Sequence, residues 1–151
     1  MLKLRKNKKG FTLVELIVVI AIMAVLAGVV AGVTVSQLNK QTNKTGSTQA
    51  KTIADYISTV TLTGENEEGE LKLLDADGAF STTALQGLIT AQYSAASIKV
   101  VYSENKPDSF TPGQIAVYLE NGDVHVKYTR KGTTGDQAEY KVATTGVVSK
   151  V

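Results

Sequence analysis

One apolar stretch dominates the N-terminal part of the chain. Residues 11–35 read FTLVELIVVIAIMAVLAGVVAGVTV and contain a single charged residue, Glu15. A bilayer core of about 30 Å needs roughly 20 apolar residues in a helix, and a run of this length is several times longer than a usual strand. The pattern therefore predicts a transmembrane helix over residues 11–35.

Beyond this span the apolar residues become sparse but keep a helical spacing. In the polar stretch 36–62, Ile53, Ile57 and Val60 follow the i, i+4, i+7 rule for one face of a helix. The spacing predicts that the helix continues as an amphipathic stem over residues 36–62. The segment Thr45-Gly46-Ser47 is expected to be a weak point, because glycine and serine favour fraying or a break.

The pattern then changes to that of a globular head, residues 63–151. The acidic sequence GENEEGE at 64–70 predicts a solvated loop. Ser81 is placed to cap a short helix over 82–93, with apolar residues on one face. From residue 98 onward, alternation with period two predicts strands near 98–102, 115–120, 124–128 and 139–143.

Asn121-Gly122 lies between two of these alternating runs and predicts a tight hairpin, because both residues accept positive φ. The predicted fold class is α+β: a long N-terminal helix, half membrane-spanning and half amphipathic stem, packed on a small antiparallel β-sheet of three or four strands.

Charge and cysteine content narrow the picture further. Five basic residues and no acid lie within residues 1–10, so removing +5 from the total of +2 leaves −3 for residues 11–151. Basic residues directly before a span keep the N-terminus in the cytoplasm, which places the chain from about residue 36 onward on the other side. The absence of cysteine excludes disulfides, thiolate metal sites and cysteine nucleophiles.

Glu15 is the main candidate functional residue. A carboxylate near one end of a hydrophobic span is costly unless it is paired, so such a residue is a functional candidate by default. The alternative is a structural role at the membrane interface, where the positive end of the helix dipole favours a carboxylate by about 0.3–1 kcal/mol.

The stretch Lys8-Lys9-Gly10, then Phe11, then Glu15 and a long hydrophobic helix resembles the N-terminal signature of type IV pilins and pseudopilins. This is a class III signal peptide with an N-terminal methylation motif. The resemblance implies a basic leader peptide over residues 1–10, cleavage by a prepilin peptidase between Gly10 and Phe11, and N-methylation of Phe11. It also implies that Glu15 of one subunit pairs with the Phe11 amino group of a neighbour.

The resemblance further implies a helical homopolymer, so the partners are other copies of the chain, the prepilin peptidase, the pilus assembly platform and, before assembly, membrane lipid. The chain is expected to be a single-pass inner-membrane protein and then part of an extracellular filament. A pseudopilin of a type II secretion or DNA-uptake machine is the alternative. Two departures stand out: the span has no proline, with Gly28 and Gly32 in its outer part, and the family's disulfide loop is missing.

A remote alternative is a secreted binding domain with an ordinary signal peptide, cut after Val25-Leu26-Ala27. The apolar run is longer than the usual 7–15 residues of such signals, and Glu15 would lie inside it. These two features disfavour this alternative.

Other candidate sites are weaker. His125, the only histidine, is predicted to face solvent from its strand. Four oxygen-bearing residues that could suggest calcium are interpreted as turn residues: Asp75, Asp77, Asn121 and Asp123. No metal, cofactor or catalytic residue is predicted, and the chain is not expected to be an enzyme. No specific nucleic-acid partner is predicted either, although Lys127, Arg130 and Lys131 form a small basic patch in the sequence.

Overall fold

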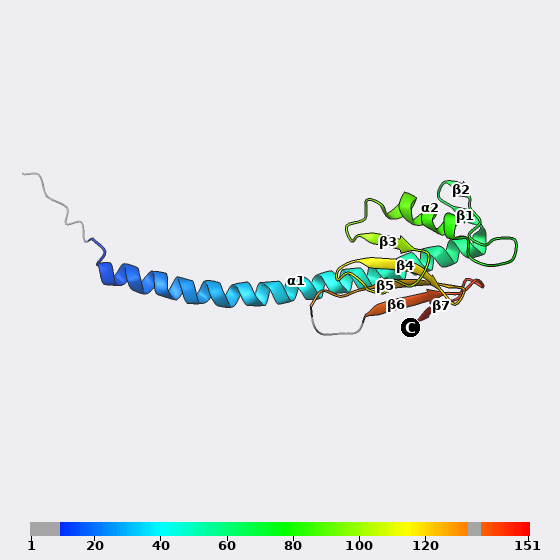
Figure 1. Ribbon diagram of the computed structural model, residues 1–151. Coiled ribbons are helices and arrows are strands. Elements are labelled where there is room, and N and C mark those ends of the chain that lie inside the picture. The colour runs from blue at the N-terminus through cyan, green and yellow to red at the C-terminus, as the bar shows by residue number, and fades with distance from the viewer. Residues whose placement is uncertain (1–9, 133–136) are drawn as a thin grey trace, which may run out of the picture. The chain divides into compact units, whose positions relative to one another are not determined.

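The computed structural model describes residues 10–132 and 137–151 of the chain. Residues 1–9 of the predicted basic leader lie outside the described residues. The chain divides into two compact units, residues 1–38 and 39–151, which are described in turn. One helix, α1 (Leu13–Thr63), contributes to both units (Figure 1). The predicted continuation of the apolar helix into a stem is therefore confirmed.

The first unit, where the structure describes it, consists of the N-terminal part of α1. Every side chain from Phe11 to Leu38 is exposed, including the valines, isoleucines and leucines of the apolar run. Water would favour burial of such surface, at about 25 cal/mol for each Å² removed from it. This part of the helix therefore needs an apolar environment that the chain itself does not provide.

The second unit combines the rest of α1 with a second helix and two small sheets. The elements after α1 are β1 (Glu65–Asn66), β2 (Gly69–Glu70), α2 (Thr82–Tyr93), β3 (Val100–Ser103), β4 (Ile115–Glu120), β5 (Asp123–Tyr128), β6 (Ala138–Val142) and β7 (Val148–Lys150). The predicted short helix is thus confirmed at 82–93. Ser81 occupies its N-cap position, but its side chain makes no capping hydrogen bond.

The main sheet has five strands in the order β3-β4-β5-β6-β7, one more than predicted. Three neighbouring pairs are antiparallel, but β3 and β4 are parallel, so the sheet is mixed. Alternation locates a strand without giving its direction, and the connection 104–114 is long enough to carry the chain back so that β4 runs alongside β3. The added strand, β7, has only three residues, too few to show a period.

The Asn121-Gly122 hairpin prediction is confirmed. Asn121 has φ 55° and Gly122 has φ 84°, the left-handed pair that a tight two-residue turn between twisted strands requires. The turn sets the register of β4 and β5, in which Glu120 lies opposite Asp123 and Tyr118 opposite His125. By contrast, the predicted loop at 64–70 contains a small exposed hairpin, β1–β2.

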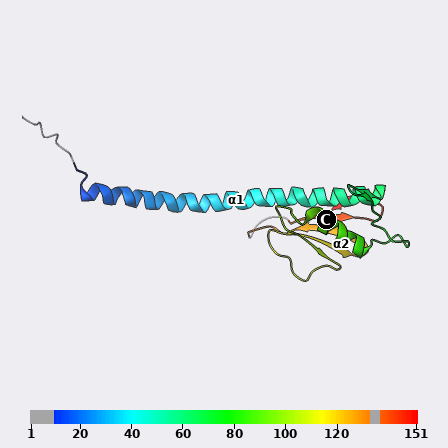
Figure 2. The same ribbon diagram turned by 90° about the horizontal axis from the view of Figure 1, so that it is seen from above.

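The hydrophobic core of the second unit lies between the stem of α1, the sheet and α2. Ile53, Ile57 and Val60 are at most 1% exposed, as their spacing predicted. Val117 and Val126 are also fully buried in this core. Burying one such aliphatic side chain stabilises a fold by about 1.5–3 kcal/mol. In both ribbon views this part of α1 lies beside the sheet (Figures 1 and 2).

The prediction of a weak point at Thr45-Gly46-Ser47 is wrong, because α1 is continuous through it. Gly46 is buried, and a Cβ atom at this position would lie 2.3 Å from the ring of Tyr128. The missing side chain therefore lets an aromatic ring from β5 pack directly on the helix backbone. Packing in the folded state outweighs the helix propensity of glycine, which is only about 1 kcal/mol less favourable than that of alanine.

Asn43 joins the same turn of α1 to the segment that follows β5. Its side-chain Oδ1 accepts hydrogen bonds from the Lys131 backbone N–H (2.9 Å) and from the Tyr128 hydroxyl (3.1 Å). Its Nδ2 donates to the Lys131 carbonyl (3.0 Å). These hydrogen bonds join residues distant in the sequence, and they set the position of the sheet along the stem.

Candidate functional site

The N-terminal segment is the first candidate site, and its environment is set by the apolar helix that follows it. Within the described residues, α1 is the one helix long and apolar enough to cross a membrane, with a mean hydropathy of 3.0 in its most apolar window and none of that window buried. Phe11, directly before the helix, is 91% exposed. Gly10 is exposed as well and lies outside the helix.

Glu15 lies in the first turn of α1, where it forms a reciprocal cap with Thr12. The Thr12 backbone N–H and hydroxyl both donate to Glu15 Oε2, each at 2.8 Å. In return, the Glu15 backbone N–H donates to the Thr12 hydroxyl oxygen at 3.3 Å. This is a capping box, in which two otherwise unpaired backbone donors of the helix end are satisfied by side chains. The spacing Thr12-x-x-Glu15 is the sequence signal for this cap.

The cap gives Glu15 a local partner within its own chain. Both hydrogen bonds end on Oε2, so the second oxygen, Oε1, makes no hydrogen bond to any residue that the structure describes. An ionised carboxylate has about four acceptor positions. The arrangement therefore holds the carboxylate at the start of the helix and leaves one oxygen able to accept from another donor.

Comparison with known proteins bears directly on this segment. Residues 5–31 match the family model of the prokaryotic N-terminal methylation motif, a range that includes Gly10, Phe11 and Glu15. The chain carries the prokaryotic N-terminal methylation motif. No curated protein and no solved structure matches the chain.

The methylation motif is the class III signal of type IV pilins and pseudopilins, so it supports a type IV pilin-like or pseudopilin precursor. The fold agrees with this, since a long N-terminal helix packed on a small mixed sheet is the pilin-like α+β architecture. The motif together with the exposed apolar helix fits a membrane-anchored prepilin. Self-assembly and processing by a prepilin peptidase are the general properties that this motif implies.

Gly28 and Gly32, within or just after the matched segment, form an open strip on the apolar helix. A Cβ atom at either position would meet no other atom within 4 Å. Their spacing allows two helices to approach closely in a membrane. Nothing in the described chain occupies this strip, in contrast to Gly46, where Tyr128 does.

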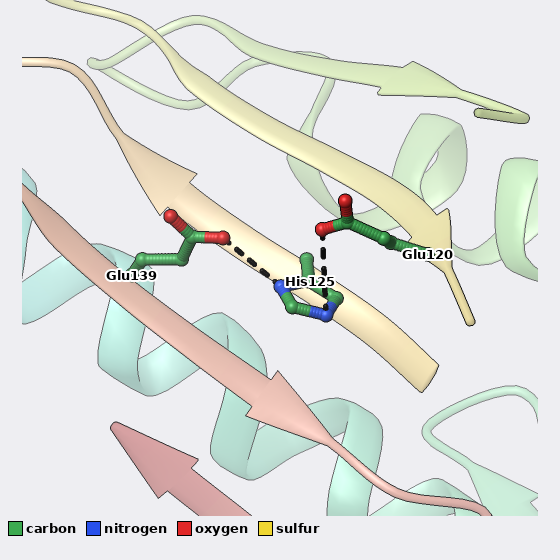
Figure 3. Close-up of side chains that lie close together, drawn as sticks. All are labelled: Glu120, His125 and Glu139. Carbon is green, nitrogen blue, oxygen red and sulfur yellow. Dashed lines mark hydrogen bonds and ion pairs between the residues drawn. The ribbon is translucent and has the colours of Figure 1, made fainter. Parts of the chain in front are cut away.

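A second side-chain cluster lies on the sheet face away from α1. His125 on β5 lies between Glu120 on β4 and Glu139 on β6 (Figure 3). His125 Nδ1 is 3.0 Å from Glu139 Oε1, and His125 Nε2 is 4.0 Å from Glu120 Oε2. The His125 ring also stacks on Tyr118, with ring centroids 5.3 Å apart.

The prediction that His125 faces solvent is wrong, because the residue is only 7% exposed. Its strand face was predicted correctly, since it alternates with the core residues Val124 and Val126. The connection 104–114 covers this second face: Phe110 packs against Tyr118 at 5.7 Å, and the Lys127 ammonium lies 4.5 Å from the Phe110 ring. Strand alternation identifies two faces but not which of them another segment covers.

Glu139 is the centre of the cluster. It accepts hydrogen bonds from the Tyr118 hydroxyl at 2.7 Å and from Lys127 Nζ at 2.9 Å, in addition to the contact with His125. Burial acts to raise the pKa of Glu139, but hydrogen bonds from Lys127, Tyr118 and His125 outweigh it and lower the pKa to about 2. Burial, together with the hydrogen bond to Glu139, raises the pKa of Tyr118.

This cluster has the composition of a metal site, because the ligand atoms of Glu120, His125 and Glu139 lie within 4.8 Å of one another. The charges favour a different role. Lys106 Nζ lies 2.9 Å from a Glu120 oxygen, and Lys127 Nζ lies 2.9 Å from a Glu139 oxygen. Two ammonium groups already balance the two carboxylates, so a divalent cation would have to displace both. The cluster is therefore an internally compensated network that stabilises the sheet.

Of the four residues considered for calcium, Asp75, Asp77 and Asn121 lie in or beside turns, whereas Asp123 begins strand β5. The Asp75 carbonyl accepts from the Gly78 N–H, which closes a turn, and Asp123 pairs with Lys141 at 2.9 Å. In the part of the chain that the structure describes, the aspartates 75, 77 and 123 do not form a ligand group.

The small basic patch predicted from Lys127, Arg130 and Lys131 does not form as a free surface. Lys127 is 14% exposed and is held by Glu139 and the Phe110 ring. Its charge is therefore not available to a phosphate in solution. Arg130 instead lies in a groove beside α1.

Proposed function

We propose that the chain is a structural subunit of a type IV pilus-like surface filament and not an enzyme. In this proposal the precursor inserts in the inner membrane with its N-terminus in the cytoplasm. The prepilin peptidase cuts after Gly10, Phe11 is N-methylated, and the assembly platform moves the subunit from lipid into a growing helical homopolymer outside the cell.

The observation that carries the proposal is the methylation motif at 5–31, which leads into the N-terminal part of α1, where every side chain from 11 to 38 is exposed. Lipid can cover these side chains before assembly, and the same segments of neighbouring copies can cover them afterwards. Outside the membrane, where water replaces lipid, removing this apolar surface from water favours a packed bundle of the N-terminal parts of α1.

Cleavage changes the charge of the segment in a way that suits this transfer. The leader with its five basic residues is lost, and one new ammonium group appears at Phe11. Glu15 Oε1, which is not used by the Thr12 cap, can accept a hydrogen bond from the Phe11 ammonium of a neighbour. In a dry bundle either charge alone would be unpaired, so the pair favours one axial register between subunits.

The first experiment is to purify the protein from membranes of its native host and to determine its mature N-terminus and intact mass. The expected result is a chain that starts at methylated Phe11. A start at Gly28 would instead indicate an ordinary secreted protein, and an intact start at Met1 would leave only a membrane anchor. Either of these results contradicts the proposal.

A pseudopilin in a secretion or DNA-uptake machine is the second candidate, since it uses the same motif. Deletion of the gene distinguishes the two. Loss of long surface filaments, with secretion and DNA uptake intact, supports the pilus subunit. Loss of secretion or DNA uptake from cells that never carried long filaments supports the pseudopilin.

A further inference from the structure

A basic groove runs along the stem of α1 in the second unit. It has a volume of about 560 Å³ and is lined on one side by Lys40, Lys44, Ser47 and Lys51, and on the other by Arg130 and Tyr140. The four stem residues recur at i, i+4, i+7 and i+11, so they lie on one helix face. Four positive side chains therefore line one groove.

The acids of the second unit compensate little of this charge. Lys51 pairs with Asp55 at 2.7 Å, but Lys40, Lys44 and Arg130 form no ion pair with any residue that the structure describes. Two polar atoms in the groove, Arg130 Nε and Ser47 Oγ, are buried without a hydrogen-bond partner among the described residues. Buried polar groups normally have partners, so a ligand with acceptor oxygens would satisfy this site.

The chain carries a surface of opposite charge on the small hairpin β1–β2. Four glutamates lie on or beside this hairpin and all are exposed: Glu65, Glu67, Glu68 and Glu70. Only Glu70 has an ion-pair partner within the described chain, Lys72 at 3.1 Å, and that pair is itself exposed. The hairpin therefore presents carboxylate oxygens, which are acceptors that could pair with the positive side chains of the groove.

In the structure the hairpin does not lie in the groove of its own chain, because no hairpin residue is among those that line the groove. Ser47 lies near the middle of the groove, and Thr63 is the last residue of α1 before the hairpin. At 1.5 Å per residue these two positions are about 24 Å apart along the helix axis. A contact between the hairpin and the groove is therefore one between two copies.

We propose that the acidic hairpin β1–β2 of one subunit docks in the basic groove of another copy. Because the two surfaces are different, each subunit can offer its hairpin to one neighbour and its groove to another, and the contact then repeats head-to-tail along the open helical assembly of the proposed filament. This inference rests on the proposed filament function. It adds a polar contact between heads to the apolar contact between helices and, through charge, selects which copies are neighbours.

Charge reversal in the full-length chain tests the contact in cells. The groove variant is Lys40→Glu with Lys44→Glu, and the hairpin variant is Glu67→Lys with Glu68→Lys. All four side chains are exposed, so the substitutions are not expected to disturb folding of the head. Each variant is expected to lower the amount of filament sheared from cells at least 10-fold, and the combined variant should restore it to near the wild-type amount.

The matched control is Lys99→Glu with Lys150→Glu, which reverses two exposed lysines outside the groove and should leave the filaments unchanged. Wild-type amounts of filament in both reversed variants would overturn the docking contact, as would a combined variant no better than either alone. If the wild-type chain itself makes no filament, the failure lies with the proposed function and not with the contact.

Disulfide trapping gives an independent readout, because the chain has no cysteine. Thr48 also lines the groove, and a chain with Thr48→Cys and, on the hairpin, Glu67→Cys should give a ladder of cross-linked multimers from mildly oxidised filaments. A bridge within one chain would leave a monomer, so a ladder reports contact between copies whose cysteines have Cα atoms within about 7 Å. The control pair Lys99→Cys with Glu67→Cys should give no ladder.

The groove could instead bind another polyanion, such as an anionic lipid surface or a nucleic acid, and that result would overturn the proposal. The purified full-length chain can be tested for binding to phosphatidylglycerol vesicles and to duplex DNA. If Lys40→Glu with Lys44→Glu abolishes that binding while filament amounts stay at the wild-type level, the groove serves lipid or nucleic acid and not a second copy.

Discussion

The two halves of α1 have similar backbones but opposite relations to their surroundings. From Leu13 to Leu38 every side chain is exposed, although most are apolar. In the stem, Ile53, Ile57 and Val60 are buried by residues of the same chain. The first half thus has an apolar surface that no described part of the chain covers, whereas the second half completes a core within one subunit.

The glycines of the two halves show the same difference. Gly28 and Gly32 have nothing within reach of a Cβ atom, whereas Gly46 is in contact with the Tyr128 ring. Substitutions in the two halves of α1 should therefore have different effects. Changes in the first half should affect assembly and leave the stability of the head intact, and changes in the second half should do the reverse.

The largest effect is expected at Glu15. Removing one partner of a buried charge pair costs about 3–5 kcal/mol, so Glu15→Ala should abolish filaments while membrane insertion and the melting temperature of the head are unchanged. Glu15→Gln is the sharper variant, because its amide oxygen can still accept from Thr12 but carries no charge. Filament counts by electron microscopy and membrane fractionation give the two readouts. Abundant filaments in Glu15→Ala cells would break the proposed pairing.

The next effect concerns Glu139 and acid stability of the head. Its pKa is about 2 in the folded chain, against an ordinary value of 4.5. A lowered pKa contributes stability that is present above pH 4.5 and is lost as the pH falls toward 2. Glu139→Gln should therefore destabilise the head at neutral pH and flatten its melting temperature between pH 4.5 and 2.

The control for Glu139 is Glu70→Gln. Glu70 pairs with Lys72 in an exposed pair, and such pairs contribute at most about 1 kcal/mol. Melting curves of the full chain in detergent at several pH values compare the variants. An unchanged pH dependence in Glu139→Gln would show that the cluster does not stabilise the head.

A smaller effect is expected when a glycine is replaced by alanine, either in the stem or in the apolar half of α1. Gly46→Ala places a Cβ atom into the Tyr128 ring, and overpacking of this kind costs about 1–3 kcal/mol, partly offset by about 1 kcal/mol of helix propensity. Gly32→Ala meets nothing in its own chain and should leave the melting temperature of the head unchanged. Equal melting temperatures for Gly46→Ala and the wild type would contradict the packing described for the stem.

The smallest effect is expected at Ser81. A serine at an N-cap contributes about 1 kcal/mol when its side chain bonds to the helix, but that of Ser81 makes no such bond. Ser81→Ala should therefore change the free energy of unfolding by less than about 0.5 kcal/mol, measured by urea denaturation. A loss near 1 kcal/mol would mean that the cap forms in solution.

The sequence alone determined the features that depend on residues close together in the chain. The apolar run, the stem spacing of Ile53, Ile57 and Val60, the helix at 82–93 and the Asn121-Gly122 turn follow from local periodicity and turn chemistry. The methylation motif is likewise a contiguous signal. Even the Thr12–Glu15 capping box was readable from its three-residue spacing.

Only the tertiary structure decided what lies against each face. Burial of His125 depends on the 104–114 connection and on Glu139, and the continuity of α1 at Gly46 depends on Tyr128, which is 82 positions away. The parallel pairing of β3 with β4 and the position of Arg130 beside the stem lysines also depend on contacts between segments that are distant in the sequence. Local sequence patterns specify elements and their faces, whereas contacts between distant residues arise only when the chain packs.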